Sequence, residues 1–143
     1  MTVISVHKLK KTYNPDTVPV HALNGVDLSI EKGEFTAIVG PSGSGKSTLL
    51  NIIGGLDHPT EGEVFIEGTK INTLSDSDLI DFRKNNIGFV FQAYNLIPVL
   101  TASENAGFVM LLQNRKQKEI DERVNELLKE VGIGELGNKR PSE

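Results

Sequence analysis

The stretch GPSGSGKST holds the residues of this chain that are best suited to chemistry on an anion. Gly40, Gly45, Lys46 and Ser47 match the pattern G-x-x-x-x-G-K-[ST], a signature of loops that wrap phosphate groups. Glycines there allow backbone conformations that are closed to other residues, and they bring amide N–H groups close around the anion. The residues expected to contact bound phosphates are Gly40, Pro41, Ser42, Gly43, Ser44, Gly45, Lys46, Ser47 and Thr48.

Two side chains of this loop add to the backbone donors. Lys46 supplies a full positive charge, worth about 4 kcal/mol against one phosphate charge at about 4 Å and an effective dielectric near 20. Ser47 would place its hydroxyl on Mg²⁺, and Thr48 would contact the inner phosphates. A Gly/Ser linker before a capped helix is the plain alternative, but a linker needs neither the lysine nor a buried strand.

The elements around the loop fit this interpretation. The apolar run FTAIV, Phe35 to Val39, predicts a strand buried on both faces that opens directly on the loop. A helix is expected from about Lys46 to the glycine pair at Gly54. This order of strand, loop and helix is the context that the motif requires.

The rest of the chain predicts further strands and helices. Alternation over Val3–Leu9 and Val26–Ile30 indicates half-buried strands, and Gly62–Ile71 indicates a hairpin with its turn at Glu67 and Gly68. Helices are expected over Ser75–Asn85, Thr101–Leu112 and Gln117–Val131. One more apolar strand is expected over Ile87–Phe91. The fold class is therefore α/β, with a phosphate-binding core over residues 1–97 and a helical region over residues 98–143.

Composition narrows the possible partners. The 143 residues carry 15 Lys and Arg against 19 Asp and Glu, so the net charge of -4 gives no reason to expect nucleic-acid binding. The lack of cysteine excludes disulfides, a thiol nucleophile and thiolate metal sites, which fits a cytoplasmic protein. Guanine specificity is not expected, because Asn138 and Lys139 are followed by Arg140 and Pro141 rather than completing N-K-x-D.

Three further features, together with the loop, carry a family resemblance. They are Tyr13 within LKKTY, Gln92 within FVFQAYNLIPVLTASEN, and the segment RPSE. With LNGVDLSIEKGEFTAIVGPSGSGKSTLLNIIGGLDHPTEGEV, these stretches resemble the nucleotide-binding domain of ABC transporters over essentially the whole chain. GGLDHPTEGEV and NKRPSE are similar to the ATPases of lipoprotein release, macrolide export and peptide export.

The resemblance implies the ABC form of the P-loop NTPase fold, here as its N-terminal portion. That portion has an antiparallel β subdomain, part of the parallel core sheet and the start of the helical subdomain. Tyr13 would stack on adenine, and Gln92 would reach Mg²⁺ and the attacking water beside Lys46. From the residues alone, Tyr13 could instead cover the end of a strand, and Gln92 could equally well just end one.

The resemblance also implies cofactors and partners. ATP and Mg²⁺ would be bound, a transmembrane permease would hold the protein at the cytoplasmic face of the membrane, and a second nucleotide-binding domain would complete a homodimer. Phe91, Tyr94 and Leu96 would line the groove for the permease, or else belong to the core. His7, His21 and His58 are isolated, and Lys10 and Lys11 look like ordinary surface residues.

Some motifs of this family are not found in the sequence. There is no apolar run ending in Asp-Glu and no LSGGQ signature, which in relatives directly follows RPSE. We therefore expect a truncated domain whose apolar edges lack neighbours, and which binds ATP without efficient hydrolysis. The alternative is a nucleotide-binding module that regulates a partner without turnover, while a soluble P-loop kinase is disfavoured by the Gln92 segment.

Overall fold

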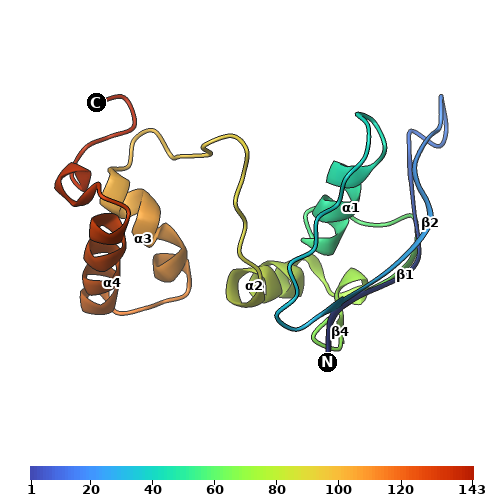
Figure 1. Cartoon of the computed structure of the whole chain (residues 1–143), viewed down its shortest axis with the longest axis horizontal. Helices are drawn as coiled ribbons and strands as arrows, with labels where there is room; N and C mark the ends of the chain where they lie inside the picture. The colour runs from blue at the N-terminus through green and yellow to red at the C-terminus, as the bar shows by residue number, and fades with distance from the viewer. The chain divides into compact units, whose positions relative to one another are not determined.

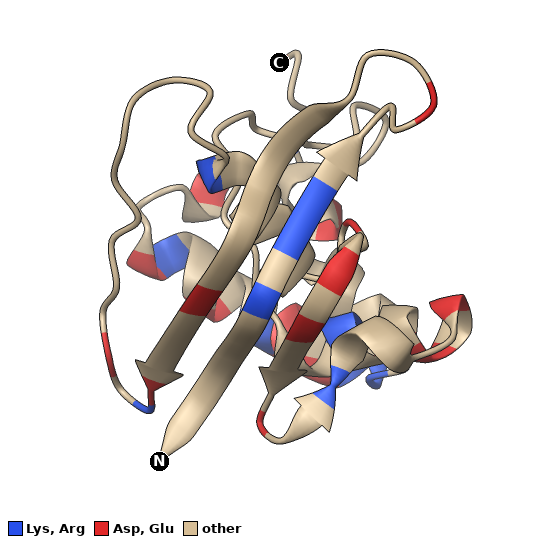
Figure 2. Ribbon diagram, turned by 90° about the vertical axis from the view of Figure 1, so that its right-hand side faces the viewer, with Lys and Arg blue, Asp and Glu red and all other residues tan.

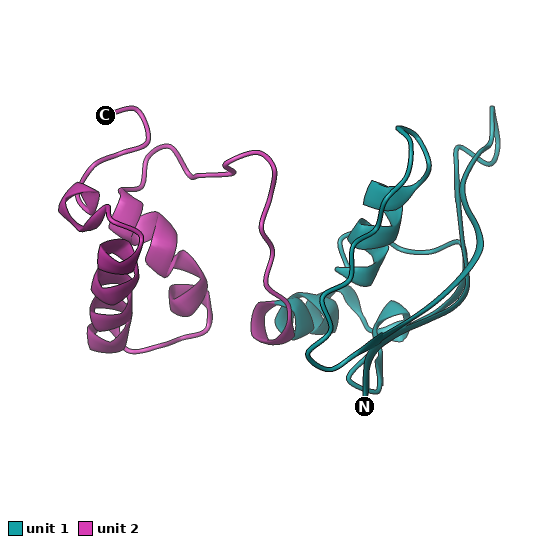
Figure 3. Ribbon diagram, viewed as in Figure 1, with its two compact units in different colours: residues 1–83 teal, residues 84–143 magenta.

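The computed structural model describes all residues from Met1 to Glu143, and the chain divides into two compact units, residues 1–83 and 84–143 (Figure 3). The division falls within α2, Asp76–Asn86. The boundary after residue 97 that the composition suggests stays a prediction. None of the helices combines the length and the apolar character needed to cross a bilayer.

The first unit is built on a four-stranded antiparallel sheet with the order β2-β1-β3-β4. Its strands are β1 Thr2–Tyr13, β2 Val20–Glu31, β3 Glu61–Ile66 and β4 Thr69–Lys70. Val6 pairs with Leu28 on one side and Val64 on the other, so apolar side chains meet across three strands. The two predicted half-buried strands are confirmed, and both are longer than their alternating cores.

A bulge in β1 shifts its side chains by one position. His7 pairs with Glu63 and Lys10 with Glu61, so β1 uses one residue more than β3 over this interval. Lys8 has a φ of 47°, and its N–H donates to Asp27 Oδ1 at 2.9 Å. Gly62 lies against the bulge, where an added Cβ would come within 2.6 Å of the carbonyl oxygen of Lys8.

The hairpin of β3 and β4 turns at Glu67 and Gly68, as predicted. Both residues have positive φ, 46° and 79°, which is typical of a two-residue hairpin loop. A short 3₁₀ helix, η1 Ile71–Thr73, follows and buries Ile71. This hairpin places β4 at the edge of the sheet opposite β2.

One face of the sheet packs against α1, Lys46–Ile53, which lies to one side of the strands (Figure 1). Every third or fourth residue of α1 is buried, so its apolar stripe faces the core. The buried apolar residues of this unit are Val6, Leu9, Leu23, Leu49, Ile52, Ile53, Val64, Ile66, Ile71 and Leu79. The predicted end of α1 at Gly54 is confirmed.

The opposite face of the sheet carries alternating charge. Lysines of the central strand β1 lie between acidic residues of β2 and β3 (Figure 2). Lys10 forms an ion pair with Glu61 at 2.8 Å, and Lys70 pairs with Glu63. These exposed pairs contribute little to stability, so packing against α1 holds this unit together.

The predicted capping of α2 by Ser75 is confirmed, because Ser75 Oγ accepts the N–H of Asp78 at 3.2 Å. In the second unit, α3 Ala102–Leu112 packs against α4 Gln117–Glu130, and a 3₁₀ helix, η2 Gly134–Leu136, follows. Both predicted helices are confirmed. A small core of Ile120, Val124 and Leu128 joins them, with Met110 at its edge.

Two predicted strands are wrong. Residues 35–39 and 87–91 form no strand, and no strand of the chain pairs with them. Their apolar side chains are exposed instead, with Phe35 at 96% and Val90 fully so. A strand forms only where a neighbour satisfies its N–H and C=O groups, and none of the 143 residues supplies one here.

Packing of α1 predicts a contrast between two substitutions in that helix. Ile52→Ala should lower the free energy of unfolding by about 2–5 kcal/mol, because Ile52 is 1% exposed and leaves a cavity. Leu50→Ala is the matched control: Leu50 is 54% exposed, so its loss should cost no more than about 0.5 kcal/mol. Urea unfolding followed by circular dichroism measures both, and equal losses would contradict this packing.

Candidate functional site

No side chain caps the N-terminus of α1. Gly45 is the N-cap residue, no side chain accepts from the first turn, and no acidic residue lies in that turn. The first N–H groups of any helix have no partner within it, and those of Lys46, Ser47 and Thr48 donate to no carbonyl elsewhere in the chain. The positive end of the helix dipole and several free donors therefore point toward the loop before it.

Gly45 fixes this helix start against the sheet. It adopts the left-handed conformation with a φ of 86°. An added Cβ would lie 2.4 Å from the carbonyl oxygen of Ala22 and 3.1 Å from Leu23 Cδ2, so no larger residue fits. The loop is thus anchored on β2 at a point where only glycine can stand.

Lys46 folds back over the loop that precedes it. Its Nζ donates to the carbonyl oxygens of Gly40 at 2.9 Å and Pro41 at 2.7 Å, and lies 3.4 Å from Ser44 Oγ. The N–H of Ser44 also donates to the Pro41 carbonyl, at 3.3 Å. The ammonium group therefore closes a compact turn, with its three protons directed at loop oxygens.

The remaining loop residues predicted to bind phosphate lie around this turn. Ser42, Gly43 and Ser47 are exposed, while Thr48 is half-buried on the first turn of α1. The arrangement gathers amide donors, one ammonium group and hydroxyls on a single turn. Chemically it can hold a polyanion, and Ser47 could share its hydroxyl with a cation bound to that anion.

Tyr13 ends β1 and pairs with Val20 of β2. Ala22, which contacts Gly45, follows shortly after Val20, so the tyrosine and the loop lie toward the same end of the β1–β2 ladder. Tyr13 Oη donates to Asp57 Oδ2 at 2.7 Å, and Lys11 Nζ lies 4.8 Å from the centre of its ring. Sequence reasoning missed Asp57 and took Lys11 for an ordinary surface residue.

Gln92 lies outside the group of residues that the first unit brings together. It is exposed and follows Phe91 in an irregular segment of the second unit. The rings of Phe89 and Phe91 stack at 5.5 Å just before it. Its predicted roles remain predictions.

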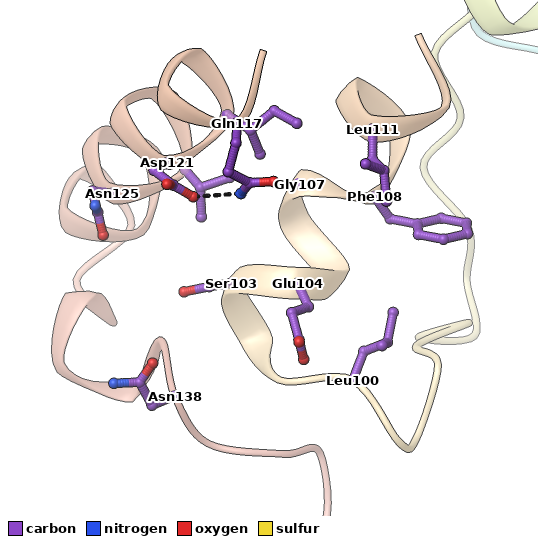
Figure 4. Close-up of a pocket in the computed structure, with 12 residues that line it drawn as sticks. Leu100, Ser103, Glu104, Gly107, Phe108, Leu111, Gln117, Asp121, Asn125 and Asn138 are labelled. Carbon is purple, nitrogen blue, oxygen red and sulfur yellow. Dashed lines mark hydrogen bonds between the residues drawn. The ribbon is translucent and has the colours of Figure 1, made fainter. Parts of the chain in front are cut away.

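A cavity of about 590 Å³ opens between α3 and α4 in the second unit (Figure 4). Its carboxylates are already engaged: Asp121 accepts from Gln117 Nε2 at 2.7 Å, and Glu104 accepts from the N–H of Thr101 at the start of α3. None of the residues predicted to bind phosphate or base lines this cavity. The loop at residues 40–48 is therefore the stronger candidate site.

Comparison with known proteins shows the family to which the chain belongs. Residues 23–143 match the family model described as ABC transporter. An uncharacterised ABC transporter ATP-binding protein of Methanocaldococcus jannaschii, MJ0796, is 45% identical, with 99% of this chain and 62% of that protein covered. The lipoprotein-releasing system ATP-binding protein LolD of Alcanivorax borkumensis is 41% identical, with coverages of 98% and 61%.

A third relative and one solved structure extend the comparison. The macrolide export ATP-binding/permease protein MacB of Mannheimia succiniciproducens is 42% identical over 100% of this chain and 22% of its own length. The dimeric post-hydrolysis structure of the ATP-binding cassette MJ0796 with ADP and Pi superposes with a TM-score of 0.89. It is 45% identical, and the match covers 97% of this chain and 62% of that one.

This chain thus spans less than two thirds of the length of its MJ0796 and LolD relatives. The superposition confirms the expected fold class, the N-terminal portion of an ABC-type P-loop ATPase domain. The uncapped helix start, the left-handed glycine and the lysine of the loop lie within the matched residues. The chain belongs to the ABC transporter family, as part of an ATP-binding domain.

Proposed function

We propose that this chain binds Mg-ATP through residues 40–48, as the nucleotide-binding portion of a transporter ATPase. The observation that carries this proposal is the uncapped N-terminus of α1 beside Gly45, with Lys46 bent over it. A polyphosphate brings several negative oxygens, and the free amides and helix dipole of this turn are complementary to them. No carboxylate of the first turn of α1 competes for that position.

Binding requires Lys46 to exchange partners. Its ammonium leaves the carbonyl oxygens of Gly40 and Pro41 for phosphate oxygens, which carry full charge and form stronger hydrogen bonds. The turn is already closed around the lysine, so little backbone needs to be reordered. This preformed shape favours affinity because less conformational freedom is lost on binding.

Ser47, Thr48 and Gln92 complete the proposed site. Mg²⁺ would neutralise part of the phosphate charge, with the exposed hydroxyl of Ser47 as one of its ligands. Thr48, on the same first turn, contacts the inner phosphates. Gln92 would be a further residue to hold the metal and the attacking water, and it would report the nucleotide state to the transport partner.

Tyr13 supplies a stacking surface for the base. It lies toward the same end of the β1–β2 ladder as the loop, and it is partly exposed. Every base has an aromatic face, so this contact contributes affinity without reading base identity. Adenine is favoured here only through the family to which the chain belongs.

The relatives indicate the setting in which this portion acts. LolD and MacB are named for lipoprotein release and macrolide export, and the MJ0796 cassette was solved as a dimer. We propose a role of the same kind for this chain. It couples ATP to export or extraction at the cytoplasmic face of a membrane, beside a permease and a second ATP-binding domain.

We propose ATP binding by these residues, and not ATP hydrolysis by them alone. The 143 residues contain no apolar run ending in Asp-Glu and no LSGGQ segment. Lys46, the loop amides and bound Mg²⁺ would supply electrostatic stabilisation, but these residues offer no carboxylate to orient water together with Gln92. This chain therefore binds ATP without efficient hydrolysis.

Lys46→Ala should lower the affinity for Mg-ATP by about 100-fold or more, because the ammonium contributes about 3–4 kcal/mol against phosphate charge. Isothermal titration of the 143-residue chain measures the change. The matched control is Lys32→Ala, which removes a charge from the exposed end of β2 and should leave the affinity within about twofold. Equal effects of the two substitutions would show that only general charge attraction is involved.

Phosphate release should stay at the rate of the buffer when the chain is incubated with Mg-ATP at saturating concentration. The physical reason is that no carboxylate is assigned to activate water. A coupled phosphate assay measures this rate, with Lys46→Ala as the reference for contaminating ATPase. Steady release that disappears in Lys46→Ala would overturn the claim of inefficient turnover and leave ATP binding intact.

Tyr13→Ala should weaken ATP and GTP binding to the same extent, by about 1–3 kcal/mol, because the stacking surface is lost for either base. Competition against a fluorescent ATP analogue gives both affinities. Tyr94→Ala is the control, since Tyr94 is the other tyrosine and lies in the second unit. Loss of GTP binding alone would show base-specific recognition instead.

A further inference from the structure

Asp57 collects three hydrogen bonds at the end of β1. Its Oδ2 accepts from Tyr13 Oη at 2.7 Å, and its Oδ1 accepts from Lys11 Nζ at 2.6 Å. The backbone N–H of His58 donates to the same Oδ1 at 2.7 Å. Both oxygens of this carboxylate are therefore engaged, and the tyrosine ring is tethered by its outer atom.

Lys11 contacts both Asp57 and Tyr13. Its side chain is only 13% exposed, and its Nζ also donates to the carbonyl oxygen of His58 at 2.7 Å. The same ammonium lies 4.8 Å from the centre of the Tyr13 ring, a cation–π distance. One face of the ring is thus occupied, and Tyr13 as a whole is 36% exposed.

The protonation state of Asp57 suits this arrangement. Partial burial raises its pKa, but the hydrogen bonds from Lys11, Tyr13 and the His58 N–H outweigh that effect. The pKa of Asp57 therefore lies below its ordinary value, and the carboxylate stays ionised down to acidic pH. Both donors keep their acceptor throughout the neutral range.

We infer that Lys11 and Asp57 are positioning residues that hold Tyr13 as a one-sided stacking surface for the nucleobase. Asp57 fixes the hydroxyl and Lys11 covers one face, so the base can stack only on the opposite face. The hydroxyl is already donated to Asp57, and its proton is not available to read a base. The inference rests on the proposed stacking role of Tyr13 and adds the residues that orient it.

Orientation of the ring changes affinity because an untethered side chain must be ordered when the base binds. Asp57→Ala and Tyr13→Phe each remove the tether and keep the ring, so each should lower ATP affinity about threefold to tenfold. The double variant should be no weaker than Asp57→Ala alone, because Asp57→Ala already removes the one contact that Tyr13→Phe removes. Asp57→Asn keeps one acceptor and should recover part of the affinity.

Inorganic tripolyphosphate is the second probe, because it lacks the base. Its affinity should stay within about twofold of the unsubstituted chain in all these variants, since the loop at residues 40–48 is untouched. Lys11→Met keeps the length of the side chain and removes the charge, and it should weaken ATP but not tripolyphosphate. Isothermal titration of the 143-residue chain measures both ligands.

The outcomes separate this inference from the function on which it rests. If Tyr13→Ala weakens ATP alone while Asp57→Ala and Tyr13→Phe change nothing, positioning is overturned and stacking stands. If Asp57→Ala weakens ATP and tripolyphosphate equally, Asp57 has only a structural role. If Tyr13→Ala leaves both ligands unchanged, the stacking role itself is lost, and the positioning role is lost with it.

Discussion

The contact between Gly45 and the carbonyl oxygen of Ala22 is the constraint on which the site depends. A residue with a side chain would collide with β2, so glycine lets α1 start hard against the sheet. That start leaves the first amides of α1 without acceptors and aims them at the loop. The antiparallel sheet therefore holds the loop before α1 in place at Gly45.

The β1–β2 ladder therefore serves both ends of the proposed ligand. Its Ala22 supports the turn around Lys46, and its last pair presents Tyr13 for the base. Two lysines have different surroundings within this unit: Lys46 donates to loop carbonyl oxygens, whereas Lys11 is paired with Asp57 beside an aromatic ring. The two lysines differ because the side chain of Lys11 is nearly buried.

Local sequence signals predicted much of this structure. The glycine loop, the turn at Glu67 and Gly68 and the end of α1 are each specified by a few neighbouring residues, and each is present as expected. The strands expected at residues 35–39 and 87–91 would each need a neighbouring strand, and apolar composition does not reveal that none of the 143 residues supplies one. The link from Lys11 to Asp57 joins residues 46 positions apart, so spacing gave no sign of it.

The bulge at His7 and Lys8 has a consequence for how the protein can vary. Successive residues of a strand alternate between two faces, so one added residue exchanges the faces of everything beyond it. The extra residue brings Leu9 into the core and, beyond it, directs Lys11 and Tyr13 toward Asp57. Between Val6 and Leu9 the number of residues matters more than their identity. A single deletion there would act like a reading-frame error, turning Lys11 and Tyr13 away from Asp57.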